Sequence, residues 1–329
     1  MTSGSRPRRR EAASGRDGLL NVLKPPGMTS HDVVARIRRL LGVRRVGHTG
    51  TLDPGAAGVL VLCVGRAARL VELLQAEDKA YRAEMCLGVS TDTQDAFGEP
   101  IRTDPDCAVD RRKLMDVLQR FVGRRQQVPP MTSAVRHRGR RLYELAREGV
   151  AVERRPRTIR IHRLHLVRVE PDQEVLRCGA RVTFDVVCSK GTYVRTLCAD
   201  LGEALGCGAF MSFLLRTRVG ALELSGARTL EELEAAVATG RSVLLPMDAA
   251  LAGWPRVQLS EEAARRVLHG QVVTGPPATP GADGCGERDG PPADRPLARL
   301  YDPDGNLLGM AEPQPRGTEV VWRPRIVFS

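Results

Sequence analysis

Residues 47–64 read Gly-His-Thr-Gly-Thr-Leu-Asp-Pro-Gly-Ala-Ala-Gly-Val-Leu-Val-Leu-Cys-Val, a glycine-rich segment followed by an apolar run. The glycines before Asp53 permit backbone conformations that other residues avoid, and Pro54 disfavours helical geometry at Asp53. The apolar run at 59–64 predicts a buried strand. Asp53 is therefore expected on a tight loop braced by a strand, which is a common mounting for a catalytic carboxylate. The same residues also fit a purely structural Asx turn.

The segments on either side of this stretch alternate between helix-like and strand-like patterns. Apolar residues at every second position predict strands, and apolar residues three or four apart predict helices. Strands are expected at 19–23, 59–64, 81–87 and 182–188, and helices at about 30–41, 114–121, 194–205 and 230–238. Thr229 and Glu232 form a capping box that marks one helix start, and Gly206 marks one helix end. Without a repeating strand–helix–strand order or a Gly-x-Gly-x-x-Gly motif, the sequence predicts an α+β fold built on a mixed sheet.

The length of 329 residues predicts roughly two domains. Residues 1–18 combine arginines with Ser, Gly and Pro and are expected to form a disordered basic tail. The main domain is expected at 19–250. A smaller β-rich unit is expected at 251–329, with a short helix near 260–269 and a Pro- and Gly-rich disordered insertion at about 275–296.

The charge balance indicates a polyanionic partner. The chain has 50 Lys and Arg against 39 Asp and Glu, a formal net charge of +11, and such an excess is typical of proteins that bind nucleic acid. Only four of the basic residues are lysines, a ratio that codon usage in a GC-rich genome would also produce. The clusters at 136–141 and 154–157 are candidate RNA contacts, although arginine-rich loops can equally be solvated surface. Aromatic residues make up only 4%, so any base-stacking platform is expected to be small.

The cysteines and the hydropathy pattern point to a reduced cytoplasm. The eight cysteines include no Cys-x-x-Cys pair, and no histidine pair completes a zinc pattern. We therefore expect reduced thiols and no bound metal. No stretch reaches the ~18 apolar residues that a membrane span requires, and no signal peptide precedes the first strand. The sequence predicts a cytoplasmic location without membrane attachment.

The segment around Asp53 resembles the catalytic motif of the TruB family of tRNA pseudouridine synthases. Other segments resemble the family's remaining motifs in the same order, at 21–30, 79–81, 129–136, 191–196 and 208–216. Together they cover roughly residues 19–250. The resemblance implies the pseudouridine synthase fold, whose central sheet is mixed and mainly antiparallel with flanking helices. The C-terminal unit is similar in size and position to the PUA-type RNA-binding domain that follows TruB catalytic domains.

The resemblance implies an isomerase that converts uridine to pseudouridine in the T-arm loop of tRNA, at position 55. The reaction breaks the bond between uracil N1 and ribose C1′ and rejoins the base through C5, so no cofactor, redox partner or metal is expected. Asp53 is implied as the nucleophile, with attack at C1′ or at C6 left open. Burial raises the pKa of a carboxyl group, so Asp53 requires a cation. Arg195 is the partner that the family supplies, although its pattern alone also fits a surface arginine on a helix.

Three further residues are implied around the substrate base. Tyr81 would stack on the uracil and accept a ribose proton, Tyr193 would support the pocket through a hydrogen bond, and Leu214 would pack against the base. The alternation around Tyr81 fits an ordinary core aromatic equally well, and Tyr193 also fits a core tyrosine with a satisfied hydroxyl. These roles therefore rest on the resemblance rather than on the local patterns.

RNA recognition is expected to involve base flipping. C1′ and C6 are hidden in a folded loop, so the target nucleotide must leave its stack at a cost of about a few kcal/mol. The resemblance implies that His48 inserts into the RNA and helps to hold the nucleotide out, whereas a lone histidine in a turn is more often structural. Arg136, Arg138 and Arg140 are expected to contact the RNA.

Two other functions fit the same residues. One is an RNA-binding or tRNA-folding protein in which catalysis is secondary. The other is a guide-RNA-dependent enzyme that modifies ribosomal RNA within a larger complex. The intact set of Asp53, Tyr81 and Arg195 favours a catalyst. Because one chain holds all of the named groups, we expect a monomer that binds the T-arm stem-loop of tRNA.

Overall fold

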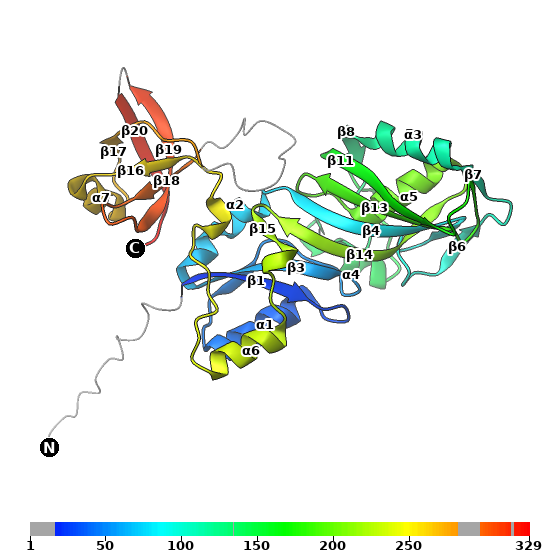
Figure 1. The fold of residues 1–329 in the computed structure, drawn as a ribbon, viewed down its shortest axis with the longest axis horizontal. Helices are drawn as coiled ribbons and strands as arrows, with labels where there is room; N and C mark the ends of the chain where they lie inside the picture. The colour runs from blue at the N-terminus through cyan, green and yellow to red at the C-terminus, as the bar shows by residue number, and fades with distance from the viewer. Residues whose placement is uncertain (1–16, 134, 282–296, 317–318) are drawn as a thin grey trace.

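The computed structural model describes residues 17–133, 135–281, 297–316 and 319–329 (Figure 1). The expected basic tail lies outside the described residues up to residue 16. Asp17 and Gly18, at the end of the expected tail, belong to the described residues. Asp17 accepts hydrogen bonds from the backbone N–H and the side-chain Nε of Arg66, both at 2.6 Å, and Gly18 begins the first strand.

A nine-stranded sheet forms the centre of the main domain (Figure 1). The strand order is β1-β3-β14-β4-β13-β11-β8, with β2 beside β3 and β15 beside β14. The strands are β1 (Gly18–Lys24), β2 (Val46–His48), β3 (Ala57–Val64), β4 (Lys79–Leu87), β8 (Gly123–Gln127), β11 (Arg157–Glu170), β13 (Arg181–Cys188), β14 (Ala209–Val219) and β15 (Leu222–Glu223). Neighbouring strands pair antiparallel except β14 and β3, which are parallel. The prediction of an α+β fold with a mixed, mainly antiparallel sheet is confirmed.

Helices cover this sheet, and their ends follow the capping residues. The helices of the main domain are α1 (Ser30–Leu41), α2 (Val71–Gln75), α3 (Arg111–Phe121), α4 (Leu142–Arg147), α5 (Val194–Leu205) and α6 (Leu230–Ala238), and α7 (Glu261–Leu268) packs on the sheet of the C-terminal unit. The apolar faces of α3 and α5 pack on β4, β11, β13 and β14, whereas α1 and α6 pack on β1 and β3. Thr29 caps α1, Gly42 ends it in the left-handed conformation, and Thr229 opens α6 with a capping box. Within the described residues, no helix is long and apolar enough to cross a membrane.

Short paired strands and single turns connect these elements. The pairs are β5 (Val89–Thr91) with β6 (Pro100–Thr103), β7 (Ala108–Asp110) with β12 (Val175–Arg177), and β9 (Arg136–His137) with β10 (Arg140–Arg141). The short 3-10 helices are η1 (Gly65–Leu70), η2 (Leu224–Gly226) and η3 (Ala249–Leu251). The β5–β6 hairpin presents the loop at 92–99, and β10 continues directly into α4. These two connections bring polar loops to the same end of the main sheet.

A separate five-stranded sheet forms the C-terminal unit, in the order β16-β18-β19-β20-β17. Its strands are β16 (Arg256–Gln258), β17 (Val273–Gly275), β18 (Ala298–Tyr301), β19 (Leu307–Arg316) and β20 (Glu319–Val327). The structure describes residues 275–281 of the expected insertion at 275–296, and residues 282–296 lie outside the described residues. Thr279 and Arg256 exchange two backbone hydrogen bonds. The first part of this segment therefore pairs with the start of β16.

The two sheets share a hydrophobic core. Leu19 and Val59 of the main sheet belong to the same buried cluster as three residues of the C-terminal part, Trp254, Met310 and Phe328. Leu19 and Val59 point away from the side of the sheet that α1 and α6 cover, because side chains alternate along a strand. The C-terminal unit therefore covers the face of β1 and β3 that these helices leave open.

A buried polar network accompanies this apolar contact. The Tyr301 hydroxyl donates a 2.6 Å hydrogen bond to Asp248 and accepts one at 3.1 Å from Arg299. Arg299 is 8% exposed and also donates to the backbone oxygens of Ala252 and Trp254. Burial, together with the carboxylate of Asp248, raises the pKa of Tyr301 to about 12. The hydroxyl therefore keeps its proton and remains a donor at neutral pH.

We expect Tyr301→Phe to lower the free energy of unfolding by about 1–3 kcal/mol, because it leaves Asp248 without this donor and Arg299 without one acceptor. The urea unfolding midpoint measures the loss. In an Asp248→Ala background the same substitution should cost clearly less. Equal losses in the two backgrounds would show that the Tyr301–Asp248 hydrogen bond does not stabilise the junction.

Candidate active site

A cavity of about 1110 Å³ opens at the end of the main sheet where β3 and β14 meet. Its lining combines carboxylates, a buried arginine and apolar side chains, including Asp53, Asp95, Phe97, Arg195, Met211, Phe213 and Leu214. Asp53 comes from the loop before β3, Asp95 from the β5–β6 loop and Arg195 from the first turn of α5. A concave, largely apolar surface with a few convergent polar groups is typical of a binding site. Among the described residues, no group of three or more His, Cys, Asp or Glu could hold a metal ion.

The loop that carries Asp53 is fixed by a buried lysine. Lys24, at the end of β1, is fully buried. Its ammonium group donates to the backbone oxygens of Pro25, Pro54 and Ala56 at 2.9, 3.2 and 2.7 Å. Burial lowers the pKa of Lys24 to about 8, and the charge of Asp53 opposes this shift. One cation thus anchors the backbone on the C-terminal side of the carboxylate.

A buried arginine holds the other side of the same loop. Arg216, on β14, is 1% exposed and donates to the backbone oxygens of Gly50 at 3.0 Å and Val59 at 2.7 Å. A Cβ at Gly58 would lie 2.2 Å from the backbone oxygen of Arg216, and the φ of Gly58 is 115°. Glycine is therefore required where the Asp53 loop enters β3.

Arg195 joins two carboxylates at the cavity wall. Its side chain is 5% exposed, with one terminal nitrogen 3.3 Å from Asp53 Oδ2 and the other 3.5 Å from Asp95 Oδ2. The guanidinium also donates to the Thr132 hydroxyl at 2.8 Å and to the Thr132 backbone oxygen at 3.1 Å. These contacts orient its plane. The structure brings the expected pair of Asp53 and Arg195 together, and Arg195 is not a surface residue.

The protein around Asp53 disfavours its ionised form. Burial raises the pKa of this carboxyl above its ordinary value, and the charge of Asp95 adds to the rise. Arg195 is the main opposing influence, and Lys24 and Arg216 act in the same direction as Arg195. The Asp53 side chain keeps 39% exposure toward the open cavity. A substrate that fills the cavity would remove this water, so the need for the cations would increase.

The expected tyrosine lies beneath the cavity wall. Tyr81, on β4, is 9% exposed, and burial raises the pKa of its hydroxyl although the positive charge of Arg216 opposes this shift. The hydroxyl is therefore protonated at neutral pH and could accept a proton only while it releases its own. Leu214, on the neighbouring strand β14, lines the cavity as the sequence led us to expect.

Tyr193 supports the site through its backbone. Its N–H donates to Gln127 Oε1 at 2.8 Å, and its carbonyl oxygen accepts a hydrogen bond from Gln127 Nε2 at 3.1 Å. These bonds hold the chain at the start of α5, two residues before Arg195. The Tyr193 ring is not among the cavity-lining groups of the described chain.

His48 ends β2 and packs against a second histidine. Its Nδ1 accepts a hydrogen bond from the Gly50 N–H at 3.3 Å, and its ring meets that of His31 edge to face, with centroids 5.6 Å apart. Burial lowers the pKa of His48, and His31 and Arg216 add to the shift, so the imidazole is neutral at neutral pH. His31, which the sequence patterns did not single out, lines the cavity, whereas His48 lies behind it.

The predicted RNA-contacting arginines form the β9–β10 hairpin. Arg136 and Arg140 lie on its strands, and Arg138 lies in the turn with a φ of 48°. None of the three belongs to the cavity lining in the part of the chain that the structure describes. Arg141 and Arg147, at the two ends of α4, do line it. The cationic wall of the cavity is therefore formed by Arg141, the last residue of the predicted cluster at 136–141, and by Arg147, which lies beyond that cluster.

Asp95, Lys24 and Arg216 were not predicted from the sequence, although each left a signal there. Asp95 closes the polar, turn-rich run at 91–95. Lys24 is one of only four lysines in a chain dominated by arginine, which suggests that its ammonium chemistry matters. Arg216 is a charge that follows three apolar residues of a strand at 213–215. None of these signals reveals that the three residues meet around Asp53.

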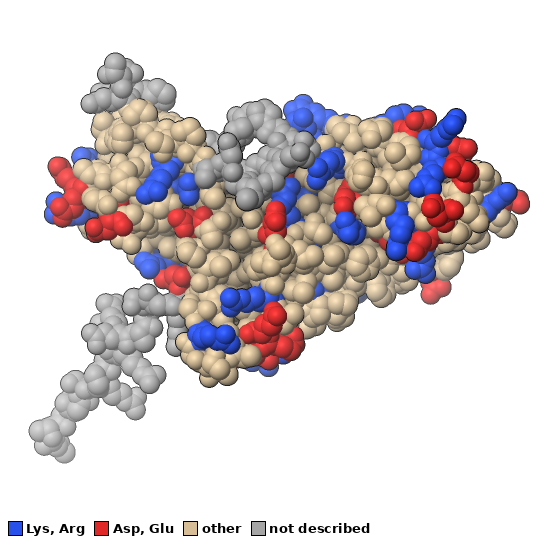
Figure 2. Space-filling view, viewed as in Figure 1, with Lys and Arg blue, Asp and Glu red and all other residues tan. Residues whose placement is uncertain are grey.

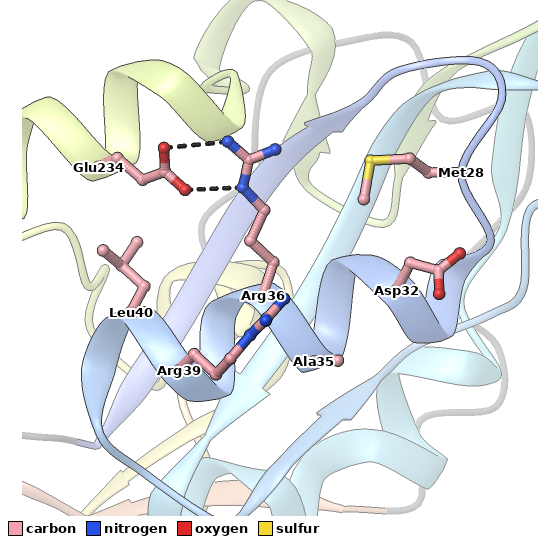
Figure 3. Close-up of a pocket in the computed structure, with 7 residues that line it drawn as sticks. All are labelled: Met28, Asp32, Ala35, Arg36, Arg39, Leu40 and Glu234. Atoms are coloured by element: carbon pink, nitrogen blue, oxygen red, sulfur yellow. Dashed lines mark hydrogen bonds and ion pairs between the residues drawn. The ribbon is translucent and has the colours of Figure 1, made fainter.

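A second hollow, of about 680 Å³, lies between α1 and α6 (Figure 3). The Arg36 guanidinium forms two hydrogen bonds with Glu234, at 2.6 and 2.9 Å, so its charge is matched within the hollow. Asp32 accepts a hydrogen bond from the Thr29 N–H as part of the α1 cap. The polar groups of this hollow therefore serve the helices, and the Asp53 cavity is the candidate active site.

The fold and the arrangement of the cavity define this protein as a pseudouridine synthase. A chain in the structure titled "Crystal Structure of a Cbf5-Nop10-Gar1 Complex" matches with a TM-score of 0.71 and 28% identity, over 95% of this chain and 85% of that chain. A chain in "Structure of H/ACA RNP bound to a substrate RNA containing 2'-deoxyuridine" matches with a TM-score of 0.69 and 26% identity, over the same shares.

Within that class, the chain belongs to the TruB family. The model for the N-terminal domain of TruB family pseudouridylate synthases matches residues 38–194, a tRNA pseudouridylate synthase B C-terminal domain matches 195–252, and a TruB C-terminal model matches 255–323. Similar proteins include tRNA pseudouridine synthase B of Symbiobacterium thermophilum, 57% identical over 79% of this chain and 84% of the relative. The tRNA pseudouridine synthase B of Moorella thermoacetica is 48% identical over 92% of this chain and 96% of the relative. The resemblance found in the sequence motifs is confirmed.

We expect Arg195→Gln to raise the pKa of Asp53 further, because the main influence that favours the carboxylate is lost. As the pH falls, the variant would then lose the ionised form at a higher pH than the parent. Arg195→Lys keeps a cation and should give a smaller rise. The carbon-13 chemical shift of the Asp53 carboxyl, followed through a pH titration, measures the change.

Arg141→Gln is the matched control for this titration. It removes an arginine from the same cavity, but the Arg141 guanidinium bonds to the Tyr143 hydroxyl at 3.0 Å. The pKa of Asp53 should stay close to that of the parent. Equal rises in the Arg195→Gln and Arg141→Gln variants would mean that the summed charge of the cavity, and not the ion pair, sets this pKa.

Proposed function

We propose that the chain isomerises uridine to pseudouridine in the T-arm loop of tRNA, at position 55, with Asp53 as the catalytic nucleophile. The observation that carries the proposal is a carboxylate 3.3 Å from a buried guanidinium, in an open cavity large enough for a nucleotide. The relatives from Symbiobacterium and Moorella are named tRNA pseudouridine synthase B, which supports the same substrate.

The reaction needs one carboxylate, a dry pocket and control of a detached base. The N1–C1′ bond of the uridine breaks, the uracil turns within the cavity, and a C5–C1′ bond forms. N1 gains a proton and C5 loses one, so atoms and charge balance. Asp53 attacks either ribose C1′, from which C5 displaces it when the new bond forms, or uracil C6, from which it is eliminated after that bond has formed, and both routes regenerate the carboxylate. With the RNA seated, water leaves the cavity, and the electrostatic attraction between Asp53 and Arg195 strengthens in the lower dielectric.

The residues around Asp53 divide the remaining work. Arg195 opposes the effect of burial on the pKa of Asp53 and so favours the ionised nucleophile, and Leu214 packs against the uracil from the cavity wall. Tyr81 is placed against the detached base. It accepts a ribose proton only while its own proton passes to a neighbour, since burial keeps its hydroxyl protonated. A proton returns to the same ribose carbon when the C5–C1′ bond forms, so the ribose of the product keeps all of its hydrogens. Tyr193 acts indirectly, because the hydrogen bonds between its backbone and the Gln127 side chain fix the start of α5, where Arg195 lies.

The RNA contacts are proposed around the cavity. Basic and acidic side chains are interspersed over the face shown in Figure 2, without one continuous basic area, so the net charge alone does not locate the RNA. Arg141 and Arg147 line the cavity, and the hairpin that carries Arg138 leads directly into Arg141. We place the T-arm loop against this side, with His48 holding the space that the flipped nucleotide leaves.

The two sheets support a division into two domains. We propose a catalytic domain at 19–250 and a PUA-like RNA-binding domain at 251–329, in agreement with the C-terminal family model at 255–323. The core that both domains share around Trp254 supports contact of both domains with one tRNA. A tRNA substrate supports a cytoplasmic location, and the presence of every catalytic group in one chain supports a monomer.

A guide-RNA-directed enzyme is the second candidate, because the similar solved structures are titled as an H/ACA RNP and a Cbf5-Nop10-Gar1 complex. Those chains share 26% and 28% identity with this one, whereas the relatives named tRNA pseudouridine synthase B share 57% and 48%. The difference favours a stand-alone tRNA enzyme.

Asp53→Asn should abolish turnover and leave tRNA affinity within a few-fold of the parent, because the amide keeps the shape of the side chain but is not a nucleophile. Tritium release from C5-labelled uridine in an unmodified tRNA transcript measures turnover, since the new carbon–carbon bond expels the C5 hydrogen. Asp92→Asn is the matched control. Asp92 lines the same cavity, but its Oδ1 accepts a hydrogen bond from the Glu99 N–H at 2.9 Å, so the variant should remain active.

Three outcomes would contradict parts of this proposal. Equal loss of turnover and affinity in Asp53→Asn would make Asp53 structural. Tritium release by the parent and by the Asp53→Asn variant at similar rates would exclude Asp53 as the nucleophile. Tight tRNA binding without release by the parent would favour an RNA-binding protein or a partner-dependent enzyme.

Arg138→Ala combined with Arg140→Ala is expected to weaken tRNA binding and to reduce its salt dependence by about one to two phosphate contacts. Arg140 is paired with Glu148 in the free protein, so Arg138 should contribute more. The slope of log Kd against log salt concentration is the measurement. The control pair, Arg111→Ala with Arg168→Ala, removes equal charge from ion-paired positions outside the cavity and should leave the slope unchanged. If the slope of the Arg138→Ala and Arg140→Ala double variant equalled that of the parent, the β9–β10 hairpin would not contact the RNA.

A further inference from the structure

Two phenylalanine rings are exposed at the mouth of the Asp53 cavity. Phe97 is 80% exposed and Phe213 is 47% exposed, and both line the cavity. The other four of the six phenylalanines are buried or partly buried. An exposed ring forgoes the stabilisation that burial provides. Two such rings at one site, in a chain with 4% aromatic residues, therefore call for a functional explanation.

The loop that presents Phe97 is fixed by Asp95. One carboxylate oxygen of Asp95 accepts hydrogen bonds from the Phe97 N–H at 3.0 Å and from the Thr93 hydroxyl at 2.7 Å. The Asp95 backbone oxygen accepts a third, from the Thr91 hydroxyl at 2.7 Å. The second carboxylate oxygen faces Arg195. Asp95, which orients Arg195, therefore also fixes the backbone of Phe97, so the loop that presents the ring is preorganised.

The Phe97 ring lies against the loop that carries the nucleophile. A Cβ at Gly55 would be 2.2 Å from Cε2 of the ring, so the ring approaches closely only because residue 55 is glycine. Gly55 follows Asp53 by two positions. The ring thus packs on Gly55 of the loop that carries Asp53, and most of its surface is open.

A β-bulge accounts for the direction of Phe213. The register of β14 against β4 shifts between Met211 and Phe213, and such bulges redirect side chains near active sites. Met211 and Leu214 line the cavity from the same strand. Phe213 therefore extends the wall formed by Leu214 out to the cavity mouth.

The cavity mouth combines these rings with positive charge, because Arg141 and Arg147 line it as well. An unpaired nucleotide offers the matching chemistry, a flat base next to an anionic phosphate. We propose that Phe97 and Phe213 stack on the unpaired bases that flank the flipped-out uridine of the substrate RNA. This inference rests on the proposed function and extends it by assigning two base-binding residues.

The test measures affinity for a T-arm stem-loop RNA in an Asp53→Asn background, so that the RNA is not converted. Two further RNAs are used, and each carries an abasic site in place of one of the two neighbours of the target uridine. Phe97→Ala and Phe213→Ala should each weaken binding of the intact RNA by about 5- to 100-fold. The Asp53→Asn protein with both phenylalanines intact should bind an abasic RNA more weakly by a similar factor. For the phenylalanine that stacks on the missing base, its Phe→Ala variant should bind this abasic RNA with little further loss of affinity.

Three further variants separate stacking from general effects on the loop. Phe97→Tyr keeps the aromatic face and should bind like the parent, whereas Phe97→Leu keeps apolar volume without a π face and should be weakened. Ile101→Ala removes a 69% exposed apolar side chain from β6 of the same hairpin and should bind like the parent. The proposal would be overturned if Phe97→Ala and Phe213→Ala both bound the intact RNA as tightly as the parent. It would also be overturned if the fold-losses in affinity from the Phe→Ala change and from the abasic site were independent and multiplied.

Tritium release by the active parent on the same stem-loop separates this inference from the proposed function. If the parent releases tritium and the phenylalanine variants bind normally, the stacking proposal is wrong and the enzymatic assignment stands. If the parent releases none, the enzymatic assignment fails, and binding of a single-stranded oligouridine decides the stacking proposal. Reduced affinity of Phe97→Ala for that oligonucleotide supports stacking, and unchanged affinity overturns it.

Discussion

The ion pair between Asp53 and Arg195 is the interaction on which the rest of this site depends. Burial drives a carboxyl group toward its neutral form, and the guanidinium 3.3 Å away opposes that shift most strongly. Arg195 can itself be 5% exposed because Asp95 and Thr132 accept hydrogen bonds from its terminal nitrogens. The nucleophile, its cation and the second carboxylate therefore form one unit, and removing any member leaves an uncompensated charge in the cavity wall.

The supports of the Asp53 loop obey the same electrostatic constraint. Lys24 and Arg216 are both buried, and their hydrogen bonds to this loop go to backbone oxygens. A carbonyl group satisfies a donor without cancelling the positive charge, so both cations continue to favour the carboxylate form of Asp53. The same bonds set the loop geometry, and Gly58 provides the room for β14 to pass beside it. Loop shape and carboxylate ionisation thus come from the same side chains.

Local patterns predicted the elements well because their causes are local. Thr29 and Thr229 cap helices through side-chain bonds to backbone three residues away, and strand alternation reflects a sheet with one face on the core. Local patterns do not record a contact whose partner lies far along the chain. Asp17 is ordered by Arg66, which is 49 residues away, and Thr279 is ordered by pairing with Arg256. No pattern within either segment records these partners.

The sequence by itself determined the fold class, the family and the pair of Asp53 and Arg195 at the centre of the site, because the motif around Asp53 and the motif around Arg195 are each contiguous. Only the tertiary structure decided which neighbours complete that site. It placed Asp95 on the far side of Arg195 and His31 rather than His48 at the cavity wall. The physical reason is that desolvation and charge act through space. A pKa shift, a shared hydrogen bond or an exposed ring depends on side chains that are close in the fold and distant in the sequence.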